Sequence, residues 1–137
     1  RAFTFSNYNL IDEKGNDLLK EIHVPKSIGY FGYLKNTIIG CLTVVVNKEK
    51  VGYFEMPLIK SSHDMALWLL IMKRGFIAYS IPNTLASYRL VSNSNTVNKK
   101  KAALDVWRVY REFENLNIIK SSFYFTFYAF NAILRRL

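Results

Sequence analysis

The order of apolar and polar residues predicts strands in the first two thirds of the chain. Residues 2–11 alternate loosely between apolar and polar side chains, which indicates a strand, and residues 12–15 predict the turn that ends it. Residues 38–46 are β-branched and apolar almost throughout, so we expect a central strand buried on both faces. Residues 76–81 and 85–90 predict two further strands.

Helical patterns dominate elsewhere. Residues 62–74 form an almost wholly apolar run that ends at Gly75, which predicts a helix buried nearly all round. From residue 99, apolar side chains recur every three or four positions up to the break at Asn115. The order of elements predicts an α/β fold: a mixed sheet with flanking helices in residues 1–97, then a helical tail rich in basic and aromatic residues in 98–137.

Composition supports a packed domain. Half of the 137 residues are hydrophobic, and aromatic residues make up 15%. Cys41 is the only cysteine, which excludes an internal disulfide and fits a reducing compartment; its apolar neighbours predict that it is buried. The chain begins with Arg1 and enters a strand pattern at once, so we expect it to be a piece of a longer protein.

The net charge of +9 is uneven, because residues 98–137 carry +5 of it. Such a basic segment favours an anionic partner: a membrane surface, nucleic acid or a polyphosphate. The basic residues form no nucleic-acid-binding motif, so we predict no nucleic-acid partner. In the tail, Lys120 and 135–136 bracket most of the aromatic residues, which predicts either a helical pair packed on the protein or a monotopic membrane contact. Exposed aromatic residues would also favour a homo-oligomer.

Asp64 is the first candidate for chemistry. It opens the apolar helix, where the positive end of the helix dipole favours an ionised carboxylate. Two interpretations are open: Asp64 caps the helix together with Ser61 or Ser62, or it has a chemical role as an ionised group held at a fixed place. Its neighbour His63 has no partners at metal-ligand spacing, and adjacent helical residues do not face one site, so we predict no metal site here. Trp68, one turn further, lies on roughly the same face of the helix as Asp64 and is either a core residue or an aromatic surface beside the carboxylate.

The spacing of three motifs resembles the second half of family 2 glycosyltransferases with the GT-A fold. These motifs are His63-Asp64 followed by the Leu-Trp-Leu helix of 67–69, then Tyr88-Arg89, then the Ser-rich residues 92–94. The family usually has Glu or Gln where this chain has His63. The similarity is greatest to bacterial enzymes that build capsule, teichuronic acid or other surface polysaccharides.

The resemblance implies an inverting transfer from a nucleotide-sugar to a glycan or lipid-linked acceptor. Asp64 would be the base, and His63 and Trp68 would contact the acceptor. Arg89, Ser92 and Ser94 would bind the donor diphosphate, although a lone Arg is also commonly a surface residue.

The family's nucleotide-binding half, with its Asp-x-Asp motif, is absent from these residues. We therefore expect Mg²⁺ or Mn²⁺ in the full-length enzyme, with its ligands outside this chain, and no turnover by this chain alone. We expect the enzyme in the cytoplasm, peripheral at the inner face of the cell membrane. The alternative function is a non-catalytic module that binds membranes or a partner through the basic, aromatic tail.

Overall fold

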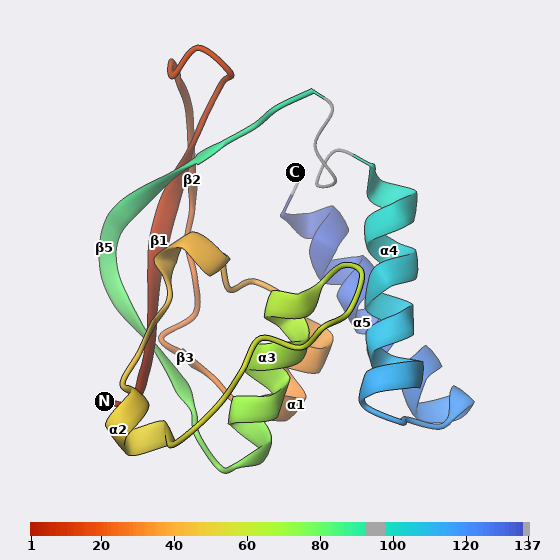
Figure 1. Ribbon diagram of the computed structural model, residues 1–137. Helices are drawn as coiled ribbons and strands as arrows, with labels where there is room; N and C mark the ends of the chain where they lie inside the picture. Colours follow the sequence, from red (N-terminus) through yellow and green to blue (C-terminus); the bar gives the residue numbers. More distant parts are fainter. Residues whose placement is uncertain (93–97, 136–137) are drawn as a thin grey trace.

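The computed structural model describes residues 1–92 and 98–135. It shows a five-stranded mixed sheet with the helices α1, α3, α4 and α5 gathered on one of its faces, so the predicted α/β class is confirmed (Figure 1). Along the chain the described elements are β1 (Phe3–Ile11), β2 (Asp17–Ile22), β3 (Ser27–Ile28), α1 (Tyr30–Lys35), the 3₁₀ turn η1 (Cys41–Thr43), β4 (Val45–Val46), α2 (Lys48–Val51), α3 (His63–Lys73), β5 (Ala78–Arg89), α4 (Lys99–Arg108), the π-helical turn η2 (Val109–Phe113) and α5 (Ile118–Leu134). The division at residue 97 stays a prediction.

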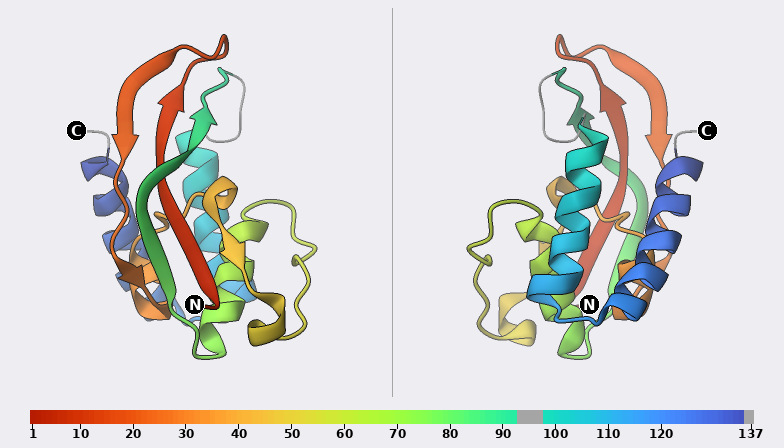
Figure 2. Two further views of the ribbon diagram at one scale, coloured as in Figure 1. Left: turned by 90° about the vertical axis from the view of Figure 1, so that its left-hand side faces the viewer. Right: turned by 90° about the vertical axis from the view of Figure 1, so that its right-hand side faces the viewer.

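β1 lies in the centre of the sheet. The strand order is β2-β1-β5-β3; β1 is parallel to β5 and antiparallel to β2, and the short β4 also pairs with β1. The predicted turn after β1 is confirmed: the Asp12 carboxylate accepts hydrogen bonds from the backbone N–H groups of Lys14 and Asn16, and Gly15 has a φ of +92°. Side views show the long β1–β2 hairpin extending beyond the helices (Figure 2).

The predicted pair of strands at 76–81 and 85–90 is wrong, because β5 is one continuous strand. Pro82 lies between the two predicted strands. A shift in the β1–β5 register accommodates it: Ile81 pairs with Ser6 and Thr84 with Asn7, so two residues of β5 bulge out. The Asn7 side-chain amide donates to the Pro82 carbonyl at 3.2 Å and fastens the bulge.

The predicted buried strand at 38–46 is also wrong. Ile38 and Ile39 are buried, but the chain then turns into η1, where the Thr43 hydroxyl donates to the Gly40 carbonyl at 2.8 Å. Of residues 38–46, only the two of β4 form a strand; it pairs with Phe3 and Thr4 at the start of β1, and Val45 is 65% exposed. The β-branched composition suggested a central strand, but the central position in the sheet, beside β1, is taken by β5. Consequently Cys41 is exposed, contrary to the prediction that it is buried.

α3 confirms the prediction of a helix buried nearly all round. Seven of its eleven residues are buried: Met65, Ala66, Leu67, Trp68, Leu69, Ile71 and Met72. The chain leaves the helix at Gly75, whose φ of +93° suits glycine. At the other end, Ser62 occupies the N-cap position in a left-handed conformation and its side chain makes no capping hydrogen bond.

The tail packs on α1 and α3 through polar and aromatic contacts. Glu114, which follows η2, is buried; its carboxylate lies 2.8 Å from the Lys73 ammonium group of α3 and accepts a hydrogen bond from Tyr30 of α1. Between α4 and α5, the rings of Trp107 and Phe125 meet edge to face at 5.6 Å. The predicted break at Asn115 is confirmed by its φ of +53°.

Removing side-chain volume from α3 should destabilise the fold strongly. Leu69 is fully buried, so Leu69→Ala should lower the free energy of unfolding by about 2–5 kcal/mol. Leu104→Ala in α4 is the matched control, because Leu104 is 59% exposed and its truncation should cost about 0.5 kcal/mol or less. Urea denaturation measures both; equal losses would contradict the packing described for α3.

Candidate functional site

Asp64 lies on the wall of a cavity of about 660 Å³ between the sheet and the tail helices. The carboxylate projects from the first turn of α3 and is half-buried. Six other segments complete the wall: the ends of β1, β2 and β5, the segment 37–42, the start of α4 and the end of α5. The lining residues include Tyr8, Leu10, Thr37, Cys41, Leu42, Tyr88, Leu90, Lys99, Tyr128 and Arg135. Far-apart parts of the sequence therefore meet around one carboxylate.

Asp64 carries the one negative charge among the described residues that line this cavity, and Lys99 and Arg135 carry two positive charges. The Arg135 guanidinium donates to the Thr37 carbonyl at 3.3 Å, which fixes the end of α5 to the cavity wall. The remaining lining is mainly apolar or aromatic. Charges in such surroundings interact more strongly than in water, so the cavity suits a ligand that is anionic in one part and offers a proton to a carboxylate in another.

The Asp64 charge acts on two neighbouring groups. Although Cys41 is exposed, partial desolvation of its thiol by the cavity wall raises its pKa, and the Asp64 carboxylate raises it further. The pKa of Tyr33, a buried residue of α1, is raised well above its usual value by burial and then by the same carboxylate. Both shifts follow because a nearby negative charge disfavours ionisation to a second anion.

The two predicted acceptor residues do not share the cavity with Asp64. His63 is exposed and is not among the described lining residues. Trp68 is 5% exposed and packs against the Phe3 ring at 5.3 Å. This placement corresponds to the core interpretation of Trp68, and the ring offers no exposed platform for a sugar. Acceptor contact by His63 stays a prediction.

The predicted donor-binding residues bind the turn between β1 and β2. The Arg89 guanidinium donates to the carbonyls of Asp12 and Glu13, at 3.3 and 2.9 Å. Ser92 donates to the Glu13 carboxylate through its backbone N–H and its hydroxyl, at 2.7 and 2.8 Å. Neither residue lines the Asp64 cavity. Ser94 lies outside the described residues. Donor binding by these residues stays a prediction.

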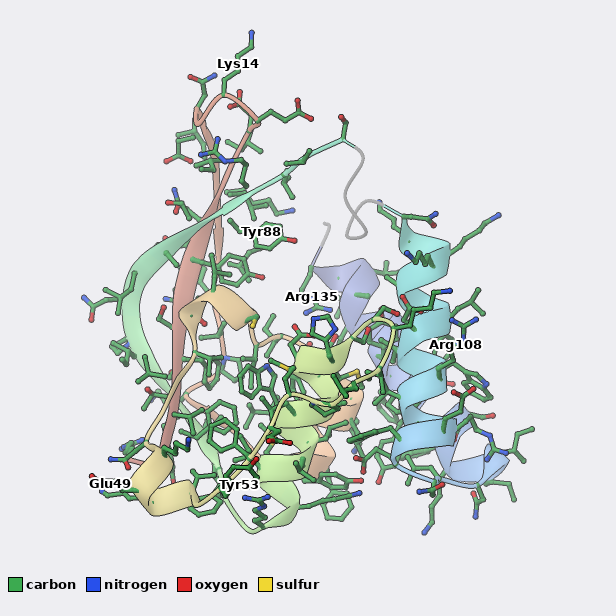
Figure 3. The ribbon with its side chains drawn as sticks, viewed as in Figure 1. Lys14, Glu49, Tyr53, Tyr88, Arg108 and Arg135 are labelled. Atoms are coloured by element: carbon green, nitrogen blue, oxygen red, sulfur yellow. The ribbon has the colours of Figure 1, made fainter. Side chains whose placement is uncertain are left out.

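Apart from Asp64, sequence reasoning assigned a role in the site to none of the residues that line the cavity, among them Tyr8, Tyr88, Lys99 and Arg135. The rings of Tyr8 and Tyr88 lie 6.1 Å apart on neighbouring strands. Figure 3 shows Tyr88 extending from β5 towards the helices, with Arg135 at the end of α5 on that side. The alternation in β1 could have placed Tyr8 and Leu10 on one face. No local signal places Lys99 or Arg135 there.

No group of three or more His, Cys, Asp or Glu side chains that could hold a metal ion occurs in residues 1–92 and 98–135. The residues of this cavity therefore do not fit a divalent-ion site. In the same ranges, no helix is long and apolar enough to cross a membrane.

Comparison with known proteins shows the class of protein. The chain is 48% identical over 136 residues, 99% of its length, to TuaG of Bacillus subtilis, which is named as a teichuronic acid biosynthesis glycosyltransferase. It is 34% identical over 113 residues, 82% of its length, to WfgD of Escherichia coli, a UDP-Glc:α-D-GlcNAc-diphosphoundecaprenol β-1,3-glucosyltransferase. A Haemophilus influenzae protein named an uncharacterized glycosyltransferase is 29% identical over 98% of the chain.

These matches identify the chain as a homologue of bacterial glycosyltransferases. More particularly, it is related to those of surface-polysaccharide biosynthesis, as the sequence motifs predicted. The chain spans about half the length of these relatives: 54% of TuaG, 44% of WfgD and 53% of the Haemophilus protein. No protein-family model and no solved structure matches the chain.

The reactivity of Cys41 should report the Asp64 charge without any assay of activity. Asp64→Asn removes a negative charge beside the thiol, so the pKa of Cys41 should fall and its alkylation by iodoacetamide at pH 8 should accelerate. Peptide mapping by mass spectrometry measures the rate. His63→Gln is the matched control, because His63 lies outside the cavity lining, and its rate should match wild type. An unchanged or slower rate in Asp64→Asn would contradict the described geometry.

Proposed function

We propose that this chain forms the acceptor-side part of an inverting glycosyltransferase that extends a bacterial cell-surface glycan. The observation that carries the proposal is the position of Asp64: a half-buried carboxylate at a helix start, on the wall of a cavity large enough for sugar-sized ligands. The homology to surface-polysaccharide glycosyltransferases supports the reaction class.

In the proposed reaction Asp64 is the general base. The acceptor hydroxyl oxygen attacks the anomeric carbon of the donor sugar, and Asp64 takes the hydroxyl proton. The bond between the anomeric carbon and the donor diphosphate breaks on the opposite side, so the configuration inverts and a nucleoside diphosphate leaves. The rigid burial of α3 favours this role, because a base must be held within hydrogen-bonding distance of the attacking hydroxyl.

The proposed ligands are a nucleotide-sugar donor and a glycan or lipid-linked acceptor. WfgD is named for an acceptor in which a sugar is attached to a diphosphate-linked undecaprenol. An acceptor of that chemistry would match the Asp64 cavity, where Lys99 and Arg135 offer positive charge to a diphosphate and the apolar walls suit the start of a lipid chain. The enzyme would then work at the inner face of the cell membrane.

Two features of the proposal lie largely outside the Asp64 cavity. Mg²⁺ or Mn²⁺ would be bound by residues of the full-length enzyme beyond this chain, since the described residues offer no suitable group. To contact the donor, Arg89 and Ser92 would have to give up their hydrogen bonds to Glu13 in the turn between β1 and β2. They would then donate hydrogen bonds to the diphosphate instead.

The test uses the full-length protein, a panel of nucleotide-sugars with Mn²⁺, and release of nucleoside diphosphate in the presence of acceptor. Asp64→Asn should lower the turnover number about 10²–10⁴-fold while keeping the fold, because the amide cannot accept the proton. Glu49→Gln is the matched control: Glu49 is exposed in α2, outside the cavity lining, and its loss should leave turnover unchanged.

Equal turnover in wild type and Asp64→Asn would remove Asp64 from the role of base. Absence of donor-dependent release from a folded wild-type enzyme, tested with undecaprenyl-diphosphate-linked GlcNAc as acceptor, would favour the alternative, a non-catalytic module. That alternative has its own structural support, since α5 exposes an apolar surface on the side away from the cavity.

A further inference from the structure

α5 carries an exposed apolar surface. We define the α5 stripe as Ile119, Phe123, Phe127, Phe130, Ile133 and Leu134. Each of these side chains is exposed, from 40% for Phe127 to 77% for Ile119. At about 100° per residue they fall within an arc of roughly 120° on one side of the helix. Thr126 is the one other residue within that arc, and its hydroxyl donates to the Ser122 carbonyl, so a single polar side chain interrupts an otherwise apolar surface.

The opposite side of α5 packs on the protein. Tyr124, Phe125 and Tyr128 are partly buried against the core, and Ser121 is fully buried. Both panels of Figure 2 show α5 along the outer border of the helical layer, where one side of the helix is uncovered. α5 is therefore held by one face and presents the other.

Lysine side chains border the α5 stripe. Lys120 lies just outside its arc on the helix, and residues 115–137 contain no Asp or Glu. Lys35 of α1 is a second such lysine, with its ammonium group 4.9 Å from the centre of the Phe127 ring and 5.5 Å from that of Phe123. The exposed Phe31 extends the apolar surface onto α1. Phenylalanine side chains beside Lys and Arg are the pattern of helices that lie in the interface of an anionic membrane.

We propose that the α5 stripe docks the protein on an anionic lipid bilayer, with α5 lying in the plane of the interface. α5 has 17 residues, so it is about 25 Å long, and no described helix is long and apolar enough to cross a membrane. Burial of the phenylalanine rings at the boundary of headgroups and acyl chains removes apolar area from water, while Lys35 and Lys120 meet lipid phosphates.

This orientation gives the Asp64 cavity a defined place relative to the bilayer. Tyr128, Ala132 and Arg135 line the cavity from the side of α5 opposite the stripe. The cavity wall thus lies about one helix diameter, some 10 Å, from the proposed interface. The docking rests on the α5 surface alone; its use, to bring a lipid-linked acceptor to Asp64, rests on the proposed function.

The test is flotation of the full-length protein with vesicles, without donor or acceptor. One set of vesicles contains equal amounts of phosphatidylcholine and phosphatidylglycerol, and the other contains phosphatidylcholine alone. Wild type should float with the anionic vesicles, less at high salt. The triple variant Phe123→Gln, Phe127→Gln, Phe130→Gln should lower the partition coefficient about tenfold or more, because it removes three rings and leaves the net charge unchanged.

The matched control is Leu85→Gln with Leu104→Gln, which removes two exposed apolar side chains outside the α5 stripe and should leave flotation unchanged. Flotation of the triple variant equal to wild type would overturn the proposal. So would wild type that fails to float, including the case in which sedimentation shows that the stripe joins two copies or is covered by the rest of the longer protein.

Failure of the docking and failure of the proposed function are separable. Asp64→Asn should float as wild type does, because the carboxylate lies on the cavity wall rather than on the α5 stripe. The triple variant should retain transfer to a water-soluble acceptor and lose transfer to one embedded in vesicles. Loss of flotation with intact transfer to the soluble acceptor would show a defect limited to the α5 stripe. Intact flotation without any transfer would show a defect limited to the catalytic role of Asp64.

Discussion

The burial of α3 on nearly all sides is the constraint around which the rest of the structure is arranged. A helix with no polar face cannot lie on a surface, so it needs the sheet on one side and other helices around it. β1 supplies part of that cover through Phe3, and α1 and η2 also contact α3. Asp64 lies in the first turn of α3, immediately before the residues that the sheet and the other helices cover. It is half-buried because this packing begins at the next residue.

The end of α3 is fixed to the tail by a buried carboxylate. Glu114 is held between the Lys73 ammonium group and the Tyr30 hydroxyl, so α3, η2 and α1 meet at one point. A buried carboxylate is costly unless it is paired and hydrogen-bonded; here Oε2 has both kinds of partner, and Oε1 is buried with no hydrogen-bond partner among the described residues. The tail is thereby joined to the core at one end of α3, while Arg135 joins it to the segment 37–42 near the other end.

Local patterns predicted those elements whose environment is encoded within a single segment. The apolar run of α3, the turn at Asp12 and the break at Asn115 each depend on near neighbours, and the structure confirms all three. The predicted central strand at 38–46 was wrong, because a β-branched run does not reveal that another strand, β5, lies beside β1. β5 remained whole across Pro82 because of a bulge opposite Asn7, which is an interaction across 75 residues of sequence.

The candidate site also has one part that could be predicted from a local pattern and another that depends on tertiary packing. Asp64 could be found from its position at a helix start, but its neighbours in the cavity come from β1, β5, α4 and α5, and only tertiary packing brings them together. Arg89 and Ser92 have a local motif, yet their hydrogen bonds are decided by the β1–β2 turn lying beside the end of β5. The sequence therefore allowed Asp64 to be predicted as a site residue, but not the residues that line the cavity around it.

The two tryptophans occupy the two parts of the molecule that the site joins. Trp68 lies within the core beside Phe3, and Trp107 lies between α4 and α5 beside Phe125. They are the only tryptophans in the chain. An indole in dry, apolar surroundings emits at shorter wavelengths than one close to water. The chain therefore contains two intrinsic fluorophores, one that reports on the integrity of the core and one that reports on movement of the tail.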